Sequence, residues 1–446
     1  MKKTAAIVLF FLVSVTGYAR AYGVQKVVSE SGIEALLIED HTTPLVSVEF
    51  SFEGGATADP EGKEGLSVFL SSTLDEGAGQ WNSRSFQKAL ADDSITLYFS
   101  SGRESFGGTF VSRLETLPQA QALLKAAINE PRFEAEAVER IREQIRQGLQ
   151  SRKESPSRKI QTFARELYFP AHTYSRAVDG SEDTLDSMTA DDLRQLHRAL
   201  FARSNLHIGV SGAISAEELS VFLDAVFGAL PLKPEIPFVE DIQPQARGGL
   251  VVIDEQIPQS LIYGVQPGLS RHDPDFYAAY VINHILGGGG FQSRLYQSVR
   301  EERGLVYSIN TSLYDLDHSP LILVSAATQN ARVGETVALL REEWKRMQEE
   351  GPTARELEEA KLYLTGSYPL RFTSTGRIAG MLLSMHRLAL PLDFLEKRNS
   401  YIEALSLADV QRVAGRLLDT EALTLVIAGQ PEGVVAVEPE RLSAEN

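Results

Sequence analysis

The sequence predicts an α+β fold made of two homologous mixed α/β domains, and three observations support that prediction. The chain has 446 residues, of which 43% are hydrophobic and 23% are charged, as in globular proteins long enough for two or three domains. A proline-rich stretch at 231–249 divides it nearly in half. Residues 187–212 align without a gap over residues 404–429, so that Asp192 matches Asp409. The two halves are therefore expected to be products of an internal duplication.

The charge balance and the lack of cysteine exclude several classes of function. Acidic residues outnumber basic ones by 60 to 43, and the net charge of −17 repels phosphate backbones, so no nucleic-acid partner is expected. The sequence contains no cysteine, which excludes disulfides, thiolate metal sites and a cysteine nucleophile. A metal in this chain would need histidine, aspartate or glutamate ligands.

The first 21 residues have the pattern of a secretory signal peptide. Two lysines follow Met1, an apolar run covers 5–15, and Ala19-Arg20-Ala21 provides small residues around a cleavage site. We predict cleavage after Ala21 and export to a bacterial periplasm. No later stretch approaches the ~20 apolar residues that a membrane-spanning helix needs, so no membrane association is expected after cleavage.

The first domain is predicted to cover residues 22–232. Its expected elements are strands over 32–38 and 45–52, a helix from Gly65-Leu66 to a glycine stop at Gly77, and a helix over 134–150. The repeated segment follows, and each copy is expected to be an amphipathic helix with an N-cap at Thr189 or Ser406. A short apolar strand then ends each copy at glycine.

A linker over 233–249 is expected to lead into the second domain, residues 250–446. Its predicted elements are strands over 250–253 and 261–265, a helix over 275–286 and a helix over 354–366. Asp273-Pro274-Asp275 is the expected N-cap region, with proline at the first helical position.

Four glycines are expected to end the 275–286 helix, namely Gly287, Gly288, Gly289 and Gly290. Ser293 is expected to cap a second helix that runs to Arg303. The strand that follows is expected to carry Leu305, Tyr307 and Ile309 on one face.

The stretch VSVEFSFEGGATADPEGKEGLSVFLSSTLDEGAG, residues 46–79, resembles the pitrilysin (insulinase-like, or inverzincin) zinc peptidases. That family carries His-x-x-Glu-His on a helix here, because residues at i, i+3 and i+4 share one face. The aligned positions are Val68, Ser71 and Ser72, and the family's third ligand, a glutamate, falls near Gly148. The resemblance therefore implies a vestigial zinc motif, with no metal in this chain.

The stretch NHILGGGGFQSRLYQSVREERGLVYSI, residues 283–309, resembles the C-terminal domain of the same family. An arginine and a tyrosine in that domain act on the bound peptide and its developing oxyanion, and the matching residues are Arg300 and Tyr307. The resemblance also implies that the tetraglycine, 287–290, lies near the bound substrate. From the residues alone, Arg300 could instead pair with Glu301 at the surface, and Tyr307 could pack under its sheet.

The resemblance implies a non-zinc subunit of a periplasmic, heteromeric zinc metallopeptidase. Its partner would be a homologous subunit that holds zinc, its substrates would be peptides, and its two domains would form a clam-like half-chamber. The alternative is a catalytically inert peptide-binding or scaffold protein of the same fold.

Overall fold

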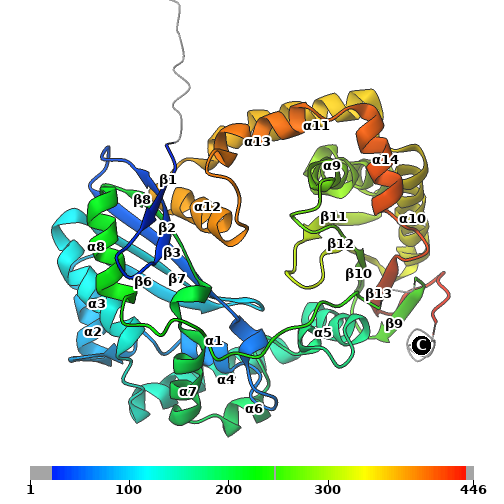
Figure 1. Cartoon of the computed structure of the whole chain (residues 1–446). Coiled ribbons are helices and arrows are strands. Elements are labelled where there is room, and N and C mark those ends of the chain that lie inside the picture. Colours follow the sequence, from blue (N-terminus) through cyan, green and yellow to red (C-terminus); the bar gives the residue numbers. More distant parts are fainter. Residues whose placement is uncertain (1–22, 246–247, 438–446) are drawn as a thin grey trace, which may run out of the picture.

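The computed structural model describes residues 23–245 and 248–437 (Figure 1). Its main sheets have six and five strands, and helices surround both of them. The predicted mixed α/β fold is confirmed. The predicted signal peptide, 1–21, lies outside the described residues. Among the helices that the structure describes, none is long and apolar enough to cross a membrane.

The first half builds the six-stranded sheet in the order β1-β2-β8-β3-β7-β6. Its strands are β1 (Gln25–Val28), β2 (Glu34–Glu39), β3 (Leu45–Glu53), β6 (Thr96–Ser101), β7 (Ser105–Arg113) and β8 (Leu206–Gly212), and β4 (Gly77–Ala78) pairs with β5 (Trp81–Asn82) apart from it. Its helices are α1 (Leu66–Ser71), α2 (Ser83–Asp92), α3 (Leu117–Asn129), α4 (Ala135–Lys153), α5 (Pro156–Tyr168), α6 (Glu182–Ser187), α7 (Ala190–Leu200) and α8 (Ala216–Phe227).

The second half builds the five-stranded sheet in the order β11-β12-β10-β13-β9. Its strands are β9 (Leu250–Asp254), β10 (Gln259–Pro267), β11 (Val306–Tyr314), β12 (Leu321–Gln329) and β13 (Thr424–Gly429). Its helices are α9 (Phe276–Asn283), the π-helices η5 (His284–Gly288) and η7 (Tyr296–Glu301), α10 (Val333–Glu350), α11 (Ala354–Gly366), the short 3₁₀ helix η9 (Tyr368–Arg371), α12 (Thr375–Arg387), α13 (Phe394–Glu403) and α14 (Leu407–Leu417).

The two sheets share one topology. In each, the last strand in sequence (β8 or β13) lies between a parallel neighbour (β2 or β9) and an antiparallel neighbour (β3 or β10). The two remaining strands of the second sheet, β12 and β11, occupy the places of β7 and β6. Strand β1 is an addition to the first sheet. This correspondence supports the duplication that the repeat predicts.

The repeated segment folds as predicted in both halves. Helices α7 and α14 have equal lengths, and each begins with a capping box, formed by Thr189 with Asp192 and by Ser406 with Asp409. The strands that follow, β8 and β13, are almost entirely buried because both faces of each sheet are covered. A covered sheet needs apolar residues on both faces, which explains the continuous apolar runs.

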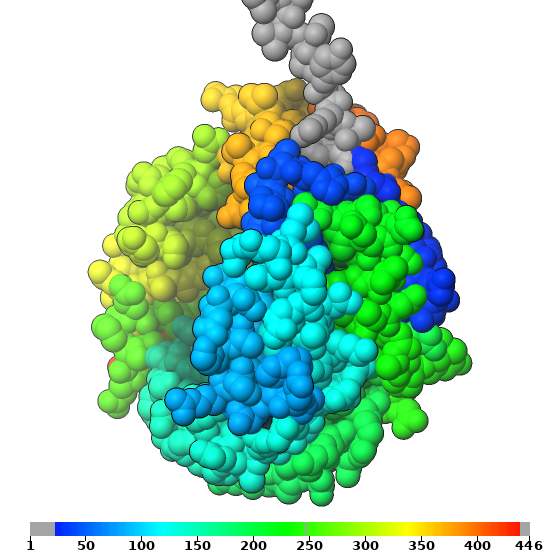
Figure 2. All heavy atoms as spheres, turned by 90° about the vertical axis from the view of Figure 1, so that its left-hand side faces the viewer, coloured from blue at the N-terminus to red at the C-terminus, as the bar shows by residue number. Residues whose placement is uncertain are grey.

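Each half lends one helix to the sheet of the other half. Helix α5 packs on β10 and β13, where Ile160 and Tyr168 join a core cluster with Val426. Helix α12 packs on β8, β3 and β2, where Leu382 joins a cluster with Leu36. Figure 1 shows both exchanges, and Figure 2 shows yellow and orange residues of the second half reaching the blue strands. These two core clusters, one around α5 and one around α12, therefore hold the two halves together.

Two predicted helix boundaries were wrong. Helix α1 ends at Ser71, six residues before Gly77, and Gly77 belongs to the short strand β4. Helix α9 begins only at Phe276, so Pro274 precedes it, and the Asp275 carboxylate makes no capping hydrogen bond. That carboxylate instead accepts hydrogen bonds from two arginines of α14.

Candidate functional site

Arg300 and Tyr307 lie against each other where η7 leads into β11. The Arg300 Cζ atom lies 5.3 Å from the ring centroid of Tyr307 and 4.6 Å from that of Tyr296. The ring of Phe291 is the third neighbour, at 5.9 Å. The guanidinium is therefore surrounded by three aromatic rings, an arrangement that holds a cation through attraction to the ring faces.

Tyr307 points outward, which excludes the interpretation that it packs under its sheet. Its side chain is 81% exposed, whereas Val306 and Ile309 are buried. The pairing of β11 with β12 shifts between Val306 and Ile309, as at a β-bulge. The prediction that Leu305, Tyr307 and Ile309 share a face was wrong for this reason.

Arg300 does touch Glu301, but that contact is weak. The closest nitrogen to oxygen distance is 3.9 Å, and both side chains are partly exposed. An exposed pair at this distance contributes little to stability. The guanidinium therefore keeps N–H groups available, and the neighbouring phenol adds an O–H donor. Two donors side by side on one surface can bind carbonyl oxygens or a developing negative charge.

The tetraglycine has a steric explanation in the structure. A Cβ added at Gly287 would lie 2.7 Å from Thr311 Oγ1, one at Gly288 would lie 2.5 Å from Asn283 Nδ2, and one at Gly289 would lie 2.6 Å from the His284 carbonyl oxygen. Gly290 has a φ of +61° and open space around it. Three of the glycines thus permit the close packing of η5. Their role in substrate binding stays a prediction. Phe291 follows Gly290 in the chain, and its ring contacts Arg300, which places the glycine run beside the cluster.

The positions aligned with the zinc motif lie on α1 and at its C-cap, Ser72, and they offer no ligands. Val68 is aliphatic, and the hydroxyls of Ser71 and Ser72 both donate to the Val68 carbonyl oxygen, at 2.8 and 2.9 Å. Ser71 is only 5% exposed. The two serines are therefore engaged within their own helix. Asp59, which is buried, holds the start of that helix by accepting hydrogen bonds from the backbone N–H groups of Gly65 and Ser67.

Gly148 lies on α4, which packs against α1. Its carbonyl oxygen accepts a hydrogen bond from Arg152 Nε at 2.8 Å, and Arg152 pairs with Asp179. A cation, Arg152, is thus the nearest side chain at the position where the resemblance implies a metal ligand. Across residues 23–245 and 248–437, no group of three or more histidines, aspartates and glutamates is arranged to hold a metal. The residues at the motif positions do not fit zinc.

Sequence reasoning missed Phe291 and Tyr296. Tyr296 precedes Arg300 by four residues on one helical segment, so spacing alone could have placed the two together. Its hydroxyl is buried and has no hydrogen-bond partner among the described residues. Phe291 is 71% exposed, and no periodicity marks it because it follows the glycine run.

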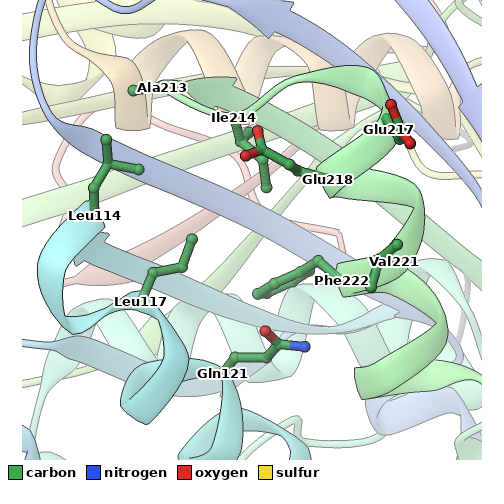
Figure 3. A pocket seen from close by; sticks show the side chains of 9 residues that line it. All are labelled: Leu114, Leu117, Gln121, Ala213, Ile214, Glu217, Glu218, Val221 and Phe222. Carbon is green, nitrogen blue, oxygen red and sulfur yellow. The ribbon is translucent and has the colours of Figure 1, made fainter.

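A separate apolar groove lies on the first half, between the start of α3 and α8 (Figure 3). Leu117 and Phe222 point into it, and Val221 lies at its edge. Glu218, which lines the groove, accepts hydrogen bonds from the backbone N–H and the hydroxyl of Ser215 in the capping box of α8. The lining contains no cation, so this groove lacks the donor chemistry of the Arg300 cluster.

Comparison with known proteins matches both halves to one family. A family described as insulinase (peptidase family M16) matches residues 34–178, and one described as peptidase M16 inactive domain matches residues 187–364. The Helicobacter pylori protein named non-peptidase homolog YmxG is 23% identical over 90% of this chain and 92% of its own length.

Two further matches also span nearly the whole chain. A Schizosaccharomyces pombe protein named probable mitochondrial-processing peptidase subunit beta is 24% identical over 88% of this chain and 87% of its own length. The crystal structure of a peptidase M16 inactive domain from Pseudomonas fluorescens has a TM-score of 0.86 and 25% identity. It covers 94% of this chain and all of that one.

Proposed function

Because the chain belongs to the insulinase family of peptidases, family M16, we propose that it is the non-zinc subunit of a heteromeric zinc metallopeptidase. In this proposal a homologous partner holds the zinc, and this chain supplies Arg300 and Tyr307 to the bound peptide. The glycine run at 287–290 and Phe291 would border the same substrate.

The observation that carries the proposal is the contrast between the two halves of the family's site. The zinc positions have lost their ligands, and Ser71 and Ser72 bond to their own helix. Arg300 and Tyr307 are still present, side by side and partly or largely exposed. A pair that no longer served a peptide would have no evident reason to keep an exposed tyrosine against an arginine. Apposition to a zinc-bearing chain would complete the site.

Two features support the wider setting of the proposal. The relative from Schizosaccharomyces pombe is named as a subunit of a processing peptidase. The N-terminal pattern of lysines, apolar run and small residues supports export to a periplasm. There the chain would meet a similarly exported partner.

A second candidate, an inert peptide-binding or scaffold protein, is favoured by the sheet edges. Strand β6 lies at one end of its sheet, and within the described residues its only sheet neighbour is β7. An extended peptide could pair with such an edge through backbone hydrogen bonds without any chemistry. This function would need neither Arg300 nor a partner.

Co-expression with an exported homologue that carries His-x-x-Glu-His separates the two candidates. The heteromer predicts co-elution of the two chains on size exclusion and peptide hydrolysis well above that of the homologue alone. The purified chain by itself should hold no stoichiometric zinc and cleave no peptide. One tightly held zinc per chain, or a mixture no more active than the homologue alone, would contradict the proposal.

A further inference from the structure

A second pocket, distinct from the Arg300 cluster, lies between α9, η9, α12 and α13. Its volume is about 270 Å³, close to the lower end of the ~300–1,000 Å³ typical of ligand pockets. Its lining is rich in aromatic rings and contains three arginines but no aspartate or glutamate. The residues that matter here are Arg271, Arg371, Arg398, Tyr277, Tyr280 and Phe394.

Arg398 is the buried cation of this pocket. It is 6% exposed, and its Nη1 donates to the Leu364 carbonyl oxygen at 2.7 Å and to Asn399 Oδ1 at 3.0 Å. Its Cζ atom lies 4.5 Å from the ring centroid of Tyr368 and 5.6 Å from that of Tyr280. Burial lowers the pKa of Arg398. These neutral partners satisfy hydrogen bonds but supply no negative charge.

Arg271 approaches the same pocket from the loop that precedes α9. Its Cζ atom lies 4.1 Å from the ring centroid of Phe276 and 5.5 Å from that of Phe394, and its Nη2 donates to the Tyr277 hydroxyl at 3.0 Å. The nearby carboxylate of Asp315 accepts from the backbone N–H of Arg271, not from its guanidinium.

Neither Arg271 nor Arg398 forms an ion pair with a carboxylate in the part of the chain that the structure describes. Elsewhere the chain pairs a buried guanidinium with a carboxylate: Arg294 donates to Glu356 from Nε at 2.6 Å and from Nη2 at 2.8 Å. A buried cation without a counter-charge is costly, and an anion that enters the pocket would offset that cost.

We propose that this pocket binds a small molecule or chain end that joins a carboxylate to an aromatic body. A guanidinium pairs with a carboxylate through parallel N–H···O hydrogen bonds, and aromatic walls suit a planar ring. The volume suits one side chain with its carboxylate, as in a C-terminal phenylalanine of a peptide or a free aromatic acid.

All residues that line the pocket belong to the second half, but one wall of the pocket is the helix that packs on the first sheet. Helix α12 contributes Met385 to the lining and also packs on β8, β3 and β2. A bound ligand would therefore fix α12 against α9 and α13 of its own half. The inference does not depend on zinc, on a partner or on Arg300.

The test is calorimetric titration of the mature chain with N-acetylphenylalanine and, separately, with N-acetylphenylalaninamide. The acid should bind with a Kd of about 1 mM or tighter and at least tenfold more tightly than the amide, because only the acid carries the charge. Equal binding of the two, or no binding of the acid, would overturn the proposal.

Variants locate the site. Arg271→Gln should weaken binding of the acid at least tenfold, whereas Arg355→Gln, on the exposed face of α11, should leave it unchanged. Thermal melts establish that both variants fold. If Arg271→Gln does not fold, Arg371→Gln, an exposed member of the lining, takes its place. Undiminished binding in the folded variant would overturn the assignment.

Titration with 3-phenylpropionate distinguishes the two sources of the ligand. If it binds at least tenfold more weakly than N-acetylphenylalanine, the pocket recognises the acylated amino group as well, and its ligand is a peptide C-terminus. If it binds equally or better, a free aromatic acid suffices. Both outcomes support the carboxylate site, and each is independent of whether the chain joins a peptidase.

Discussion

The two halves of the molecule share a topology but differ in the chemistry that their surfaces offer. In the first half the hydroxyls of Ser71 and Ser72 donate to the Val68 carbonyl oxygen of their own helix. In the second half Arg300 and Tyr307 form a cluster with an 81% exposed ring. Packing constrains the shared sheet order in both halves, whereas side chains at the site can change without disturbing it.

The acids near the corresponding helices α1 and α9 show the same contrast. Asp59 lies buried before α1, and Arg176 donates to its backbone carbonyl oxygen at 3.3 Å. The Asp59 carboxylate forms no ion pair among the described residues, and burial raises its pKa to about 7. Asp275 lies before α9, and hydrogen bonds from Arg412 and Arg416 lower its pKa to about 2. Two carboxylates that precede helices of the two halves thus have opposite electrostatic environments.

The largest expected effect lies on the second half, at Tyr307. Tyr307→Phe removes one hydroxyl and little volume, so the heteromer should still assemble. Its kcat should fall by roughly 10²–10³, the loss typical of a missing oxyanion donor. Steady-state kinetics on the reconstituted complex measure it.

The matched control is Tyr98→Phe, which removes the same hydroxyl from an exposed tyrosine of β6 in the first half. It should leave kcat unchanged. Arg300→Ala should lower kcat and also raise KM, because a residue that holds a substrate carbonyl contributes to ground-state binding. Full activity in Tyr307→Phe and Arg300→Ala would leave the chain as a scaffold.

The next effect concerns the exchanged helices. A Cβ at Gly209 on β8 would lie 2.2 Å from the Ala379 carbonyl oxygen of α12. Gly209→Ala should therefore destabilise the protein by about 1–3 kcal/mol, the range for overpacking. Gly380→Ala, on α12 itself, has open space and should stabilise by about 0.5–1 kcal/mol. Urea denaturation compares them, and equal effects would contradict the backbone contact.

Local patterns predicted the N-caps of the repeated helix and the glycines that end the repeated strand, because caps and apolar runs are local signals. The exchange of α5 and α12 was not predictable in this way. Their apolar faces are evident in the sequence, but spacing does not say which sheet a face will cover. The irregularity at Tyr307 was equally unpredictable, since the side chains of a regular strand are expected to alternate between its two faces.

The candidate site was predicted through resemblance more than through chemistry. The spacing of Arg300 and Tyr307 did not require their contact, because a helix-to-strand turn separates them. Phe291 gave no periodic signal, and the steric need for glycine at 287–289 depends on Thr311, Asn283 and the His284 backbone. These are contacts that only the folded chain defines.

A smaller effect should follow from the pH dependence of Asp59. With a folded pKa near 7 and an ordinary unfolded value near 4, the folded state binds the extra proton between these values. The free energy of unfolding should therefore fall by about 1.4 kcal/mol from pH 6 to pH 8. Asp59→Asn should remove this slope, and denaturation at the two pH values measures it. A slope that persists in the variant would assign it to another group.

The smallest effects test the equivalence of the repeat. Thr189 Oγ1 accepts from the Asp192 N–H and Ser406 Oγ from the Asp409 N–H, at 3.2 and 3.1 Å. Thr189→Ala and Ser406→Ala should each cost about 1 kcal/mol, the usual value for a lost cap.

The two aspartates of these capping boxes should contribute differently to stability, because only Asp192 pairs with a lysine. Asp192 also pairs with Lys63 at 3.1 Å, and both side chains are about three-quarters buried. Asp409 has no such ion pair among the described residues. Asp192→Ala should therefore cost more than Asp409→Ala, by about 0.5–1 kcal/mol, and Lys63→Met should remove most of that difference. Equal costs for the two aspartates would show that the caps are energetically interchangeable despite their different surroundings.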